Sequence, residues 1–132
     1  MMSYLLVAIG GAIGSVARFA SADWVQARWP TAFPWGTLAV NVLGSFIIGL
    51  LAATNESVSG AGRWSLSLEA RQFLMIGVLG GYTTFSSFSL QTLLLLRGGA
   101  ALLAGINVLA SVTLCLLAAW CGFALMAMLN RV

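Results

Sequence analysis

The stretch GGYTTFSSFSLQT, from Gly80 to Thr92, holds the side chains best suited to interact with an ion. Ser and Thr hydroxyls and a Gln amide surround Phe85 and Phe88, which are three residues apart and therefore share one face of a helix. Hydroxyl and amide N–H groups donate hydrogen bonds, and the edge of a Phe ring is the positive end of its quadrupole. These groups together could line a passage for a small anion.

Two further polar stripes occur at helical spacing. Thr37, Asn41 and Ser45 recur every four residues, and Asn107 is followed four residues later by Ser111. Hydrogen bonding between neighbouring helices explains Ser45 or Ser111 taken alone. Asn41 is harder to explain in this way, because it is the bulkiest polar side chain of its segment and lies near the segment's centre.

The chain lacks the groups that enzymatic or metal chemistry requires. It has no His, and no nucleophile is accompanied by a matching base, so we expect no enzymatic activity. The acids Asp23, Glu56 and Glu69 are expected outside the apolar segments, which disfavours a cation pathway built on carboxylates. A net charge of +3 is too sparse for a nucleic-acid partner.

Composition indicates an all-α integral membrane protein with a single domain, 1–132. Of 132 residues, 61% are hydrophobic and 7% are charged. A helix needs roughly 20 apolar residues to cross the hydrocarbon core. Four segments satisfy this requirement, and the stretch DWVQARWPTAFP after the first is expected to be a loop. The predicted spans are Tyr4 to Ala22, Trp35 to Ala53, Ala70 to Leu96 and Ala100 to Leu129.

Glycines predict two local features of these spans. Gly10 and Gly14 form a small-xxx-small pattern, which favours close helix packing. In the third span, Gly80 and Gly81 precede Thr83 and Thr84, and both residue types disfavour a helix interior. We therefore predict a break at mid-membrane, where free carbonyls could bind a cation and a half-helix N-terminus could favour an anion.

The positive charges are distributed almost equally between the two membrane sides. Orientation follows the Lys/Arg bias of short loops, and here the bias is almost nil. Insertion in both orientations, with antiparallel pairing of two copies, explains the balance; a weak signal set by one Arg also explains it. Arg18 could snorkel to the interface or attract anions to a vestibule. One side carries Arg63, Arg71 and Arg131, and the other carries Arg28 and Arg97, with Arg18 if it reaches that surface.

Three motifs resemble those of the CrcB/Fluc fluoride channels: GGAIGSVARF, WGTLAVNVLGSFIIG and GVLGGYTTFSSFS. The resemblance covers the whole chain and is weakest in the fourth span. It implies an antiparallel dual-topology homodimer in the plasma (inner) membrane, with two pores that export fluoride passively and relieve fluoride toxicity. Fluoride, membrane lipid and a second copy of the chain are the implied partners.

The resemblance also assigns residues. It implies a structural sodium ion held by main-chain carbonyls of Gly80 and Thr83. Many members have Glu where this chain has Gln91. The implied fluoride pathway consists of the rings of Phe85 and Phe88, the amide of Asn41, and the hydroxyls of Ser86, Ser87, Thr37 and Ser111.

Two other functions remain open on the sequence. A small dual-topology drug exporter also has four spans, but we expect it to need a membrane-embedded acid for proton coupling, and the predicted first span has none. A non-conducting assembly protein could use the polar stripes only to join helices.

Overall fold

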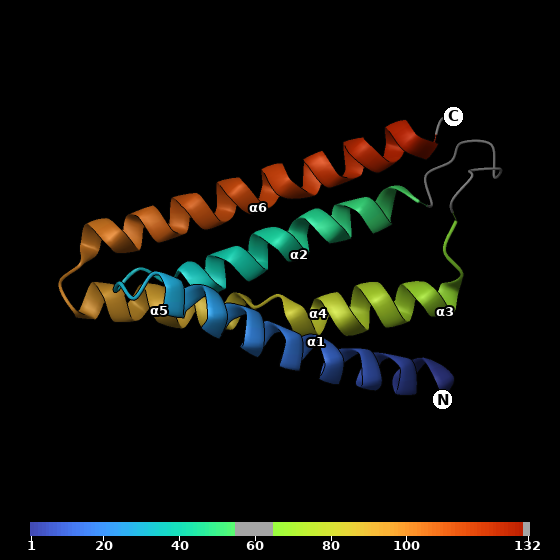
Figure 1. The fold of residues 1–132 in the computed structure, drawn as a ribbon, viewed down its shortest axis with the longest axis horizontal. Helices are drawn as coiled ribbons and strands as arrows, with labels where there is room; N and C mark the ends of the chain where they lie inside the picture. The colour runs from blue at the N-terminus through green and yellow to red at the C-terminus, as the bar shows by residue number, and fades with distance from the viewer. Residues whose placement is uncertain (55–64, 131–132) are drawn as a thin grey trace.

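The computed structural model describes residues 1–54 and 65–130, and within these ranges every regular element is a helix. Four helical stretches are long and apolar enough to cross a membrane: Met2–Arg28, Trp35–Ala53, Leu68–Arg97 and Ala101–Asn130. Figure 1 shows them running alongside one another, with both termini at the same end. The predicted four-span, all-α architecture is confirmed. Arg63, Arg131 and Glu56 lie outside the described residues.

The third span differs from the others because it is built from several helical pieces. It consists of α3 (Leu68–Arg71), the π-helix η1 (Gln72–Leu79), α4 (Gly80–Tyr82) and α5 (Phe85–Arg97). The other three spans are the single helices α1 (Met2–Arg28), α2 (Trp35–Ala53) and α6 (Ala101–Asn130).

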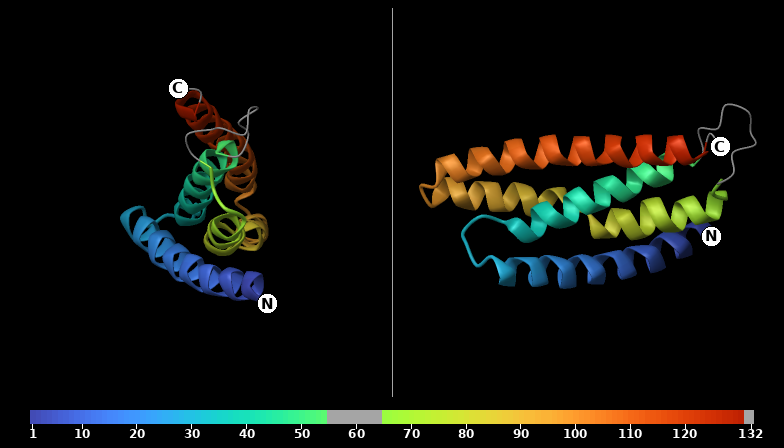
Figure 2. Two further views of the ribbon diagram at one scale, coloured as in Figure 1. Left: turned by 90° about the vertical axis from the view of Figure 1, so that its right-hand side faces the viewer. Right: turned by 45° about the horizontal axis from the view of Figure 1, so that its top comes forward.

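The helix α2 is the element around which the others are arranged. It packs along α6 on one side and contacts the third span and α1 on the other. In Figure 2 it runs obliquely past the place where α4 is followed by α5. Glycines make the α2–α6 contact close, because a Cβ at Gly49 would overlap the carbonyl of Ala119, and one at Gly122 would overlap the carbonyl of Phe46.

Glycines also allow α1 to lie directly on the third span, as the small-xxx-small pattern predicts. A Cβ at Gly10 would come within 2.6 Å of the carbonyl oxygen of Phe73, and one at Gly14 would overlap the carbonyl oxygen of Val78. On the facing helix, a Cβ at Gly81 would come within 2.5 Å of the carbonyl oxygen of Gly11. Backbone therefore packs against backbone along this contact, which leaves no room for a methyl group at Gly10, Gly14 or Gly81.

A prediction for stability follows from this contact. Gly14→Ala should destabilise the protein by about 1–3 kcal/mol, because the new methyl group must displace backbone rather than a movable side chain. Gly11→Ala is the matched control, since a Cβ there meets nothing within 4 Å. Thermal unfolding of both variants in lipid nanodiscs measures the difference; equal unfolding temperatures would show that the contact can relax.

The predicted end of the first span was wrong. α1 continues beyond Ala22 to Arg28, so Asp23 belongs to the helix rather than to a loop. The Arg28 guanidinium lies over the Trp24 ring, 4.6 Å from its centroid, four residues apart along the helix. Pro30 follows the helix end, where its missing N–H prevents continuation.

Gln26 fixes the short connection that follows. The carbonyl oxygens of Trp29, Thr31 and Phe33 lie 3.1–3.3 Å from its Nε2 and share its two N–H donors, and its Oε1 accepts a hydrogen bond from the Gly36 N–H in the first turn of α2. One side chain thus satisfies the loop carbonyls and an otherwise unpaired donor at the helix start.

Candidate ion pathway

Two consecutive threonines in extended conformation separate α4 from α5. Thr83 has φ −82° and ψ 157°, and Thr84 has φ −151° and ψ 116°. In Figure 1 this segment is the thin connection between the two helices. α4 ends at Tyr82, the Thr83 N–H still donates a helical hydrogen bond to the Leu79 carbonyl at 2.9 Å, and α5 begins at Phe85.

The amide of Asn41, on α2, is bonded to both backbone groups of Thr84. Its Oδ1 accepts from the Thr84 N–H at 2.8 Å, and its Nδ2 donates to the Thr84 carbonyl at 3.0 Å. Asn41 and Thr84 are both buried. The sequence predicts Asn41 as a pathway donor; the structure adds this pairing, which uses one of the two Nδ2 hydrogens.

Hydroxyl groups gather at the start of α5. The Oγ1 of Thr84 accepts a hydrogen bond from the Ser87 N–H at 3.2 Å and donates one to the Ser87 Oγ at 3.0 Å. The Ser86 Oγ lies 3.3 Å from the same Thr84 oxygen. These donors stand at the N-terminus of a helix of 13 residues, where the helix dipole favours negative charge.

A cavity of about 450 Å³ lies on one side of the break; we call it the ring cavity. The ring centroids of Phe85 and Phe88 are 5.3 Å apart there, with the planes tilted by 53°. Phe88 is buried, whereas Phe85 is 76% exposed in the single subunit. The lining includes Asn41, Ser45, Thr83, Thr84, Phe85, Phe88, Ser111 and Cys115.

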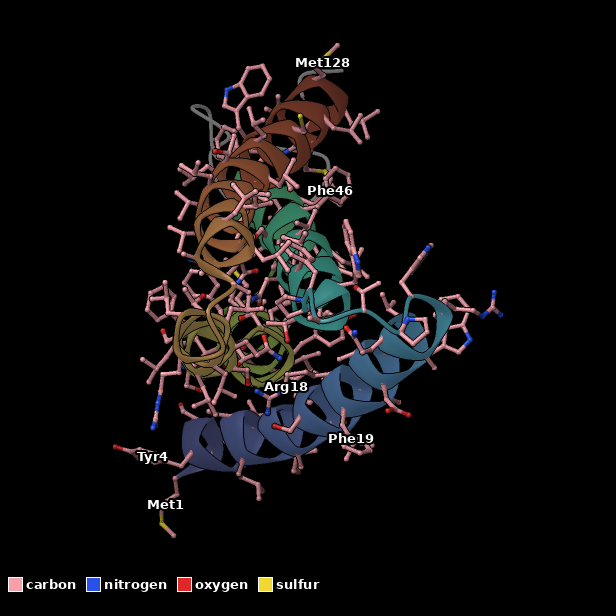
Figure 3. The ribbon with its side chains drawn as sticks, turned by 90° about the vertical axis from the view of Figure 1, so that its left-hand side faces the viewer. Met1, Tyr4, Arg18, Phe19, Phe46 and Met128 are labelled. Carbon is pink, nitrogen blue, oxygen red and sulfur yellow. The ribbon has the colours of Figure 1, made fainter. Side chains whose placement is uncertain are left out.

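A second cavity, of about 620 Å³, lies between α1, α2 and α5; we call it the vestibule. Figure 3 shows Arg18 extending from α1 toward the third span, which agrees with its place in the vestibule wall. Gln91 also lines the vestibule, and among the described residues its Oε1 is buried without a hydrogen-bond partner. The polar lining residues are Ser15, Arg18, Asp23, Gln26, Thr37, Thr84, Ser87 and Gln91.

The structure brings most of the predicted site residues to these two cavities. Asn41, Phe85, Phe88 and Ser111 line the ring cavity, while Thr37 and Ser87 line the vestibule. Ser86 lines neither, but its hydroxyl contacts Thr84.

Thr84 lines both cavities, although it is not among the site residues predicted from the sequence. Its sequence signal was its place directly after Thr83 in the predicted break. Cys115 also lines the ring cavity without having been predicted there, since a cysteine in an apolar helix is usually a packing residue.

A separate polar cluster joins α5 to α6. The Nδ2 of Asn107 donates to the Thr92 Oγ1 at 2.8 Å, and that hydroxyl donates to the Phe88 carbonyl at 2.8 Å. Asn107 is only 1% exposed. The bond from Asn107 to Thr92 is therefore an interhelical hydrogen bond of the kind expected from the polar stripe. Ser111, one turn further along α6, lines the ring cavity.

Comparison with known proteins agrees with the predicted family. The CrcB-like protein, Camphor Resistance (CrcB) family matches residues 5–123. A "Fluoride-specific ion channel FluC" of Opitutus terrae is 54% identical over 122 residues, covering 92% of this chain and 90% of that protein. Proteins of the same name from Paramagnetospirillum magneticum and Thermus thermophilus are 49% and 52% identical, covering 99% and 92% of this chain and 100% and 91% of theirs.

These relatives are named as ion channels rather than enzymes, and the match extends across all four apolar helices. The chain is a multi-pass integral membrane protein that belongs to the CrcB family.

Proposed function

We propose that the protein is a fluoride-selective channel that exports fluoride passively and so relieves fluoride toxicity. The relatives' shared name supports fluoride as the ion. The observation that carries the proposal is the lining of the ring cavity, where the Phe rings, the Asn41 amide and the Ser111 hydroxyl meet the N-terminus of α5. Among the described residues that line this cavity there is no carboxylate to repel an anion.

The path runs from the vestibule, past Thr84, into the ring cavity. Thr37 and Ser87 provide hydroxyl donors on the vestibule side, and the ring edges of Phe85 and Phe88 follow on the other. Fluoride is small and strongly hydrated, so its water must be replaced step by step. Hydroxyl groups and ring edges replace it without a formal positive charge, which allows the ion to leave again.

An antiparallel, dual-topology homodimer with two such paths is the proposed assembly. The near-equal Arg distribution supports it, as does the 76% exposure of Phe85, because a ring that contacts the ion needs a wall opposite it. Gly80 is exposed as well, on the surface of the single subunit. We place the dimer in the plasma (inner) membrane, surrounded by lipid.

A structural sodium ion at the break is the third part of the proposal. Main-chain carbonyls at an unwound helix are suitable ligands for a hard cation. Gly80 and Thr83 of each copy would hold the ion, which would tie the two breaks together electrostatically. The extended backbone at Thr83 and Thr84 fits this donor set.

Flux from liposomes tests the proposed function. Purified protein should release fluoride down its gradient without a proton gradient, and should release chloride far more slowly. Efflux that requires a proton gradient and carries an organic cation would support the drug exporter instead. Absence of any flux from well-assembled protein would support a non-conducting assembly role.

A further inference from the structure

The hydrogen bonds of Asn41 and Thr84 redirect two particular backbone amides. In a continuous α-helix each N–H donates to the carbonyl four residues earlier. The Thr84 N–H would then pair with the Gly80 carbonyl, but it donates to the Asn41 Oδ1 at 2.8 Å. The Ser87 N–H would pair with the Thr83 carbonyl, but it donates to the Thr84 Oγ1 at 3.2 Å.

We propose that Asn41 and Thr84 are positioning residues that release the Gly80 and Thr83 carbonyls for cation binding. Each redirected amide deprives one of these two carbonyls of its helical partner. The bonds to Asn41 then hold the released conformation from a separate helix, and both partners are buried. The consequence for the cation rests on the proposed function, whereas the redirected hydrogen bonds rest on the contacts themselves.

Gly44 completes this arrangement on α2. It follows Asn41 by three residues and so shares its helix face, and a Cβ at Gly44 would overlap the Cγ2 methyl of Thr83. That methyl is not free to rotate away, since the Thr83 Oγ1 donates to the Leu79 carbonyl at 2.9 Å. One face of α2 thus binds the backbone of Thr84 and provides room for the side chain of Thr83.

Solid-state NMR of the protein in lipid bilayers tests the proposal without measuring flux. The Cα and Cβ shifts of Thr84 report extended or helical backbone, and the carbonyl shifts of Gly80 and Thr83 report sodium binding. In Asn41→Leu, we expect the Thr84 shifts to move toward helical values. The sodium concentration for half of the carbonyl response should rise about tenfold or more, as expected for lost hydrogen bonds in a buried site.

Two matched variants separate this role from others. Asn107→Leu removes a buried amide that does not contact the break, and should leave the Thr84 shifts and the sodium response unchanged. Asn41→Asp keeps the acceptor for the Thr84 N–H, so Thr84 should stay extended in this variant. Fluoride flux should still fall, because the carboxylate repels the anion.

Thr84→Val and Thr84→Ser test the second amide with little risk to folding. The valine variant removes the hydroxyl that accepts from the Ser87 N–H and donates to the Ser87 Oγ, so the Ser87 N–H can return to the Thr83 carbonyl and sodium binding should weaken several-fold. The serine variant keeps the acceptor and should bind sodium as the unmodified protein does.

The possible failures are distinguishable. Extended Thr84 shifts in Asn41→Leu, with a half-saturating sodium concentration within twofold of the unmodified protein, would overturn the positioning role. If the unmodified protein shows no carbonyl response to sodium, the cation part of the proposed function fails. In that case helical Thr84 shifts in Asn41→Leu would still support the role of Asn41 in holding the break.

Discussion

Replacing both rings, Phe85→Ile together with Phe88→Ile, is expected to lower fluoride flux roughly a hundredfold, at about tenfold for each lost ring edge. Isoleucine keeps apolar bulk but has no positive ring edge to face the ion. The two rings are in contact, with centroids 5.3 Å apart, and share the ring cavity with the Asn41 amide. Fluoride efflux from liposomes measures the loss, and size-exclusion chromatography confirms that the dimer remains assembled.

Phe46→Ile is the matched control for this experiment. Phe46 lies on α2 but lines a different, apolar groove, with Trp29, Trp35 and Leu38. We expect its flux to remain near that of the unmodified protein. Met at position 85 or 88 should retain part of the flux, because its adaptable side chain fills the volume. Full fluoride flux through a well-assembled double Ile variant would contradict the proposal that the edges of the two Phe rings face the ion.

Three lysines added at the C-terminus are expected to abolish flux from a copy expressed alone. Added positive charge biases the insertion of short-loop proteins, and the present Arg distribution is so even that a few charges should decide the orientation. All copies would then face one way, and no antiparallel pair could form. Co-expression with a copy biased in the opposite direction should restore flux.

Labelling gives a direct control for that experiment. A unique Cys is placed at the C-terminus of a variant that lacks Cys115 and Cys121. Without added lysines this Cys should react with a label from both sides of the membrane, and with them it should react from one side only. Reaction from one side only, before any charge is added, would remove the dual-topology proposal.

Residue patterns predicted the spans well where apolar runs and breaking residues coincide. The bounds predicted for the second span, Trp35 to Ala53, are those observed for α2, because Pro34 precedes its first residue. The first helix continues past its apolar run to Arg28, where the Arg28 guanidinium lies over the Trp24 ring, and the Gln26 side chain of the same helix holds the connection that follows. Polar side chains can extend a helix when they find partners, and hydropathy does not include those partners.

The sequence predicted which residues form the site, but not which of them bond to one another. Side-chain chemistry and spacing selected Asn41, Phe85 and Phe88, and the structure brings all three to one cavity. The pairing of Asn41 with Thr84 joins residues 43 positions apart, so no local pattern could reveal it. The π-helical geometry of η1 was also unforeseen, because it changes the hydrogen-bond register without changing the composition.

The reversal potential of a bilayer containing the purified protein tests the central claim most directly. With chloride equal on both sides and fluoride in a tenfold gradient, a fluoride-selective channel should reverse near the fluoride equilibrium potential, at about 59 mV. The sign should invert when the gradient is inverted, and removing the proton gradient should have no effect. A reversal potential at zero under these conditions, with current still flowing, would contradict the assignment of fluoride as the selected ion.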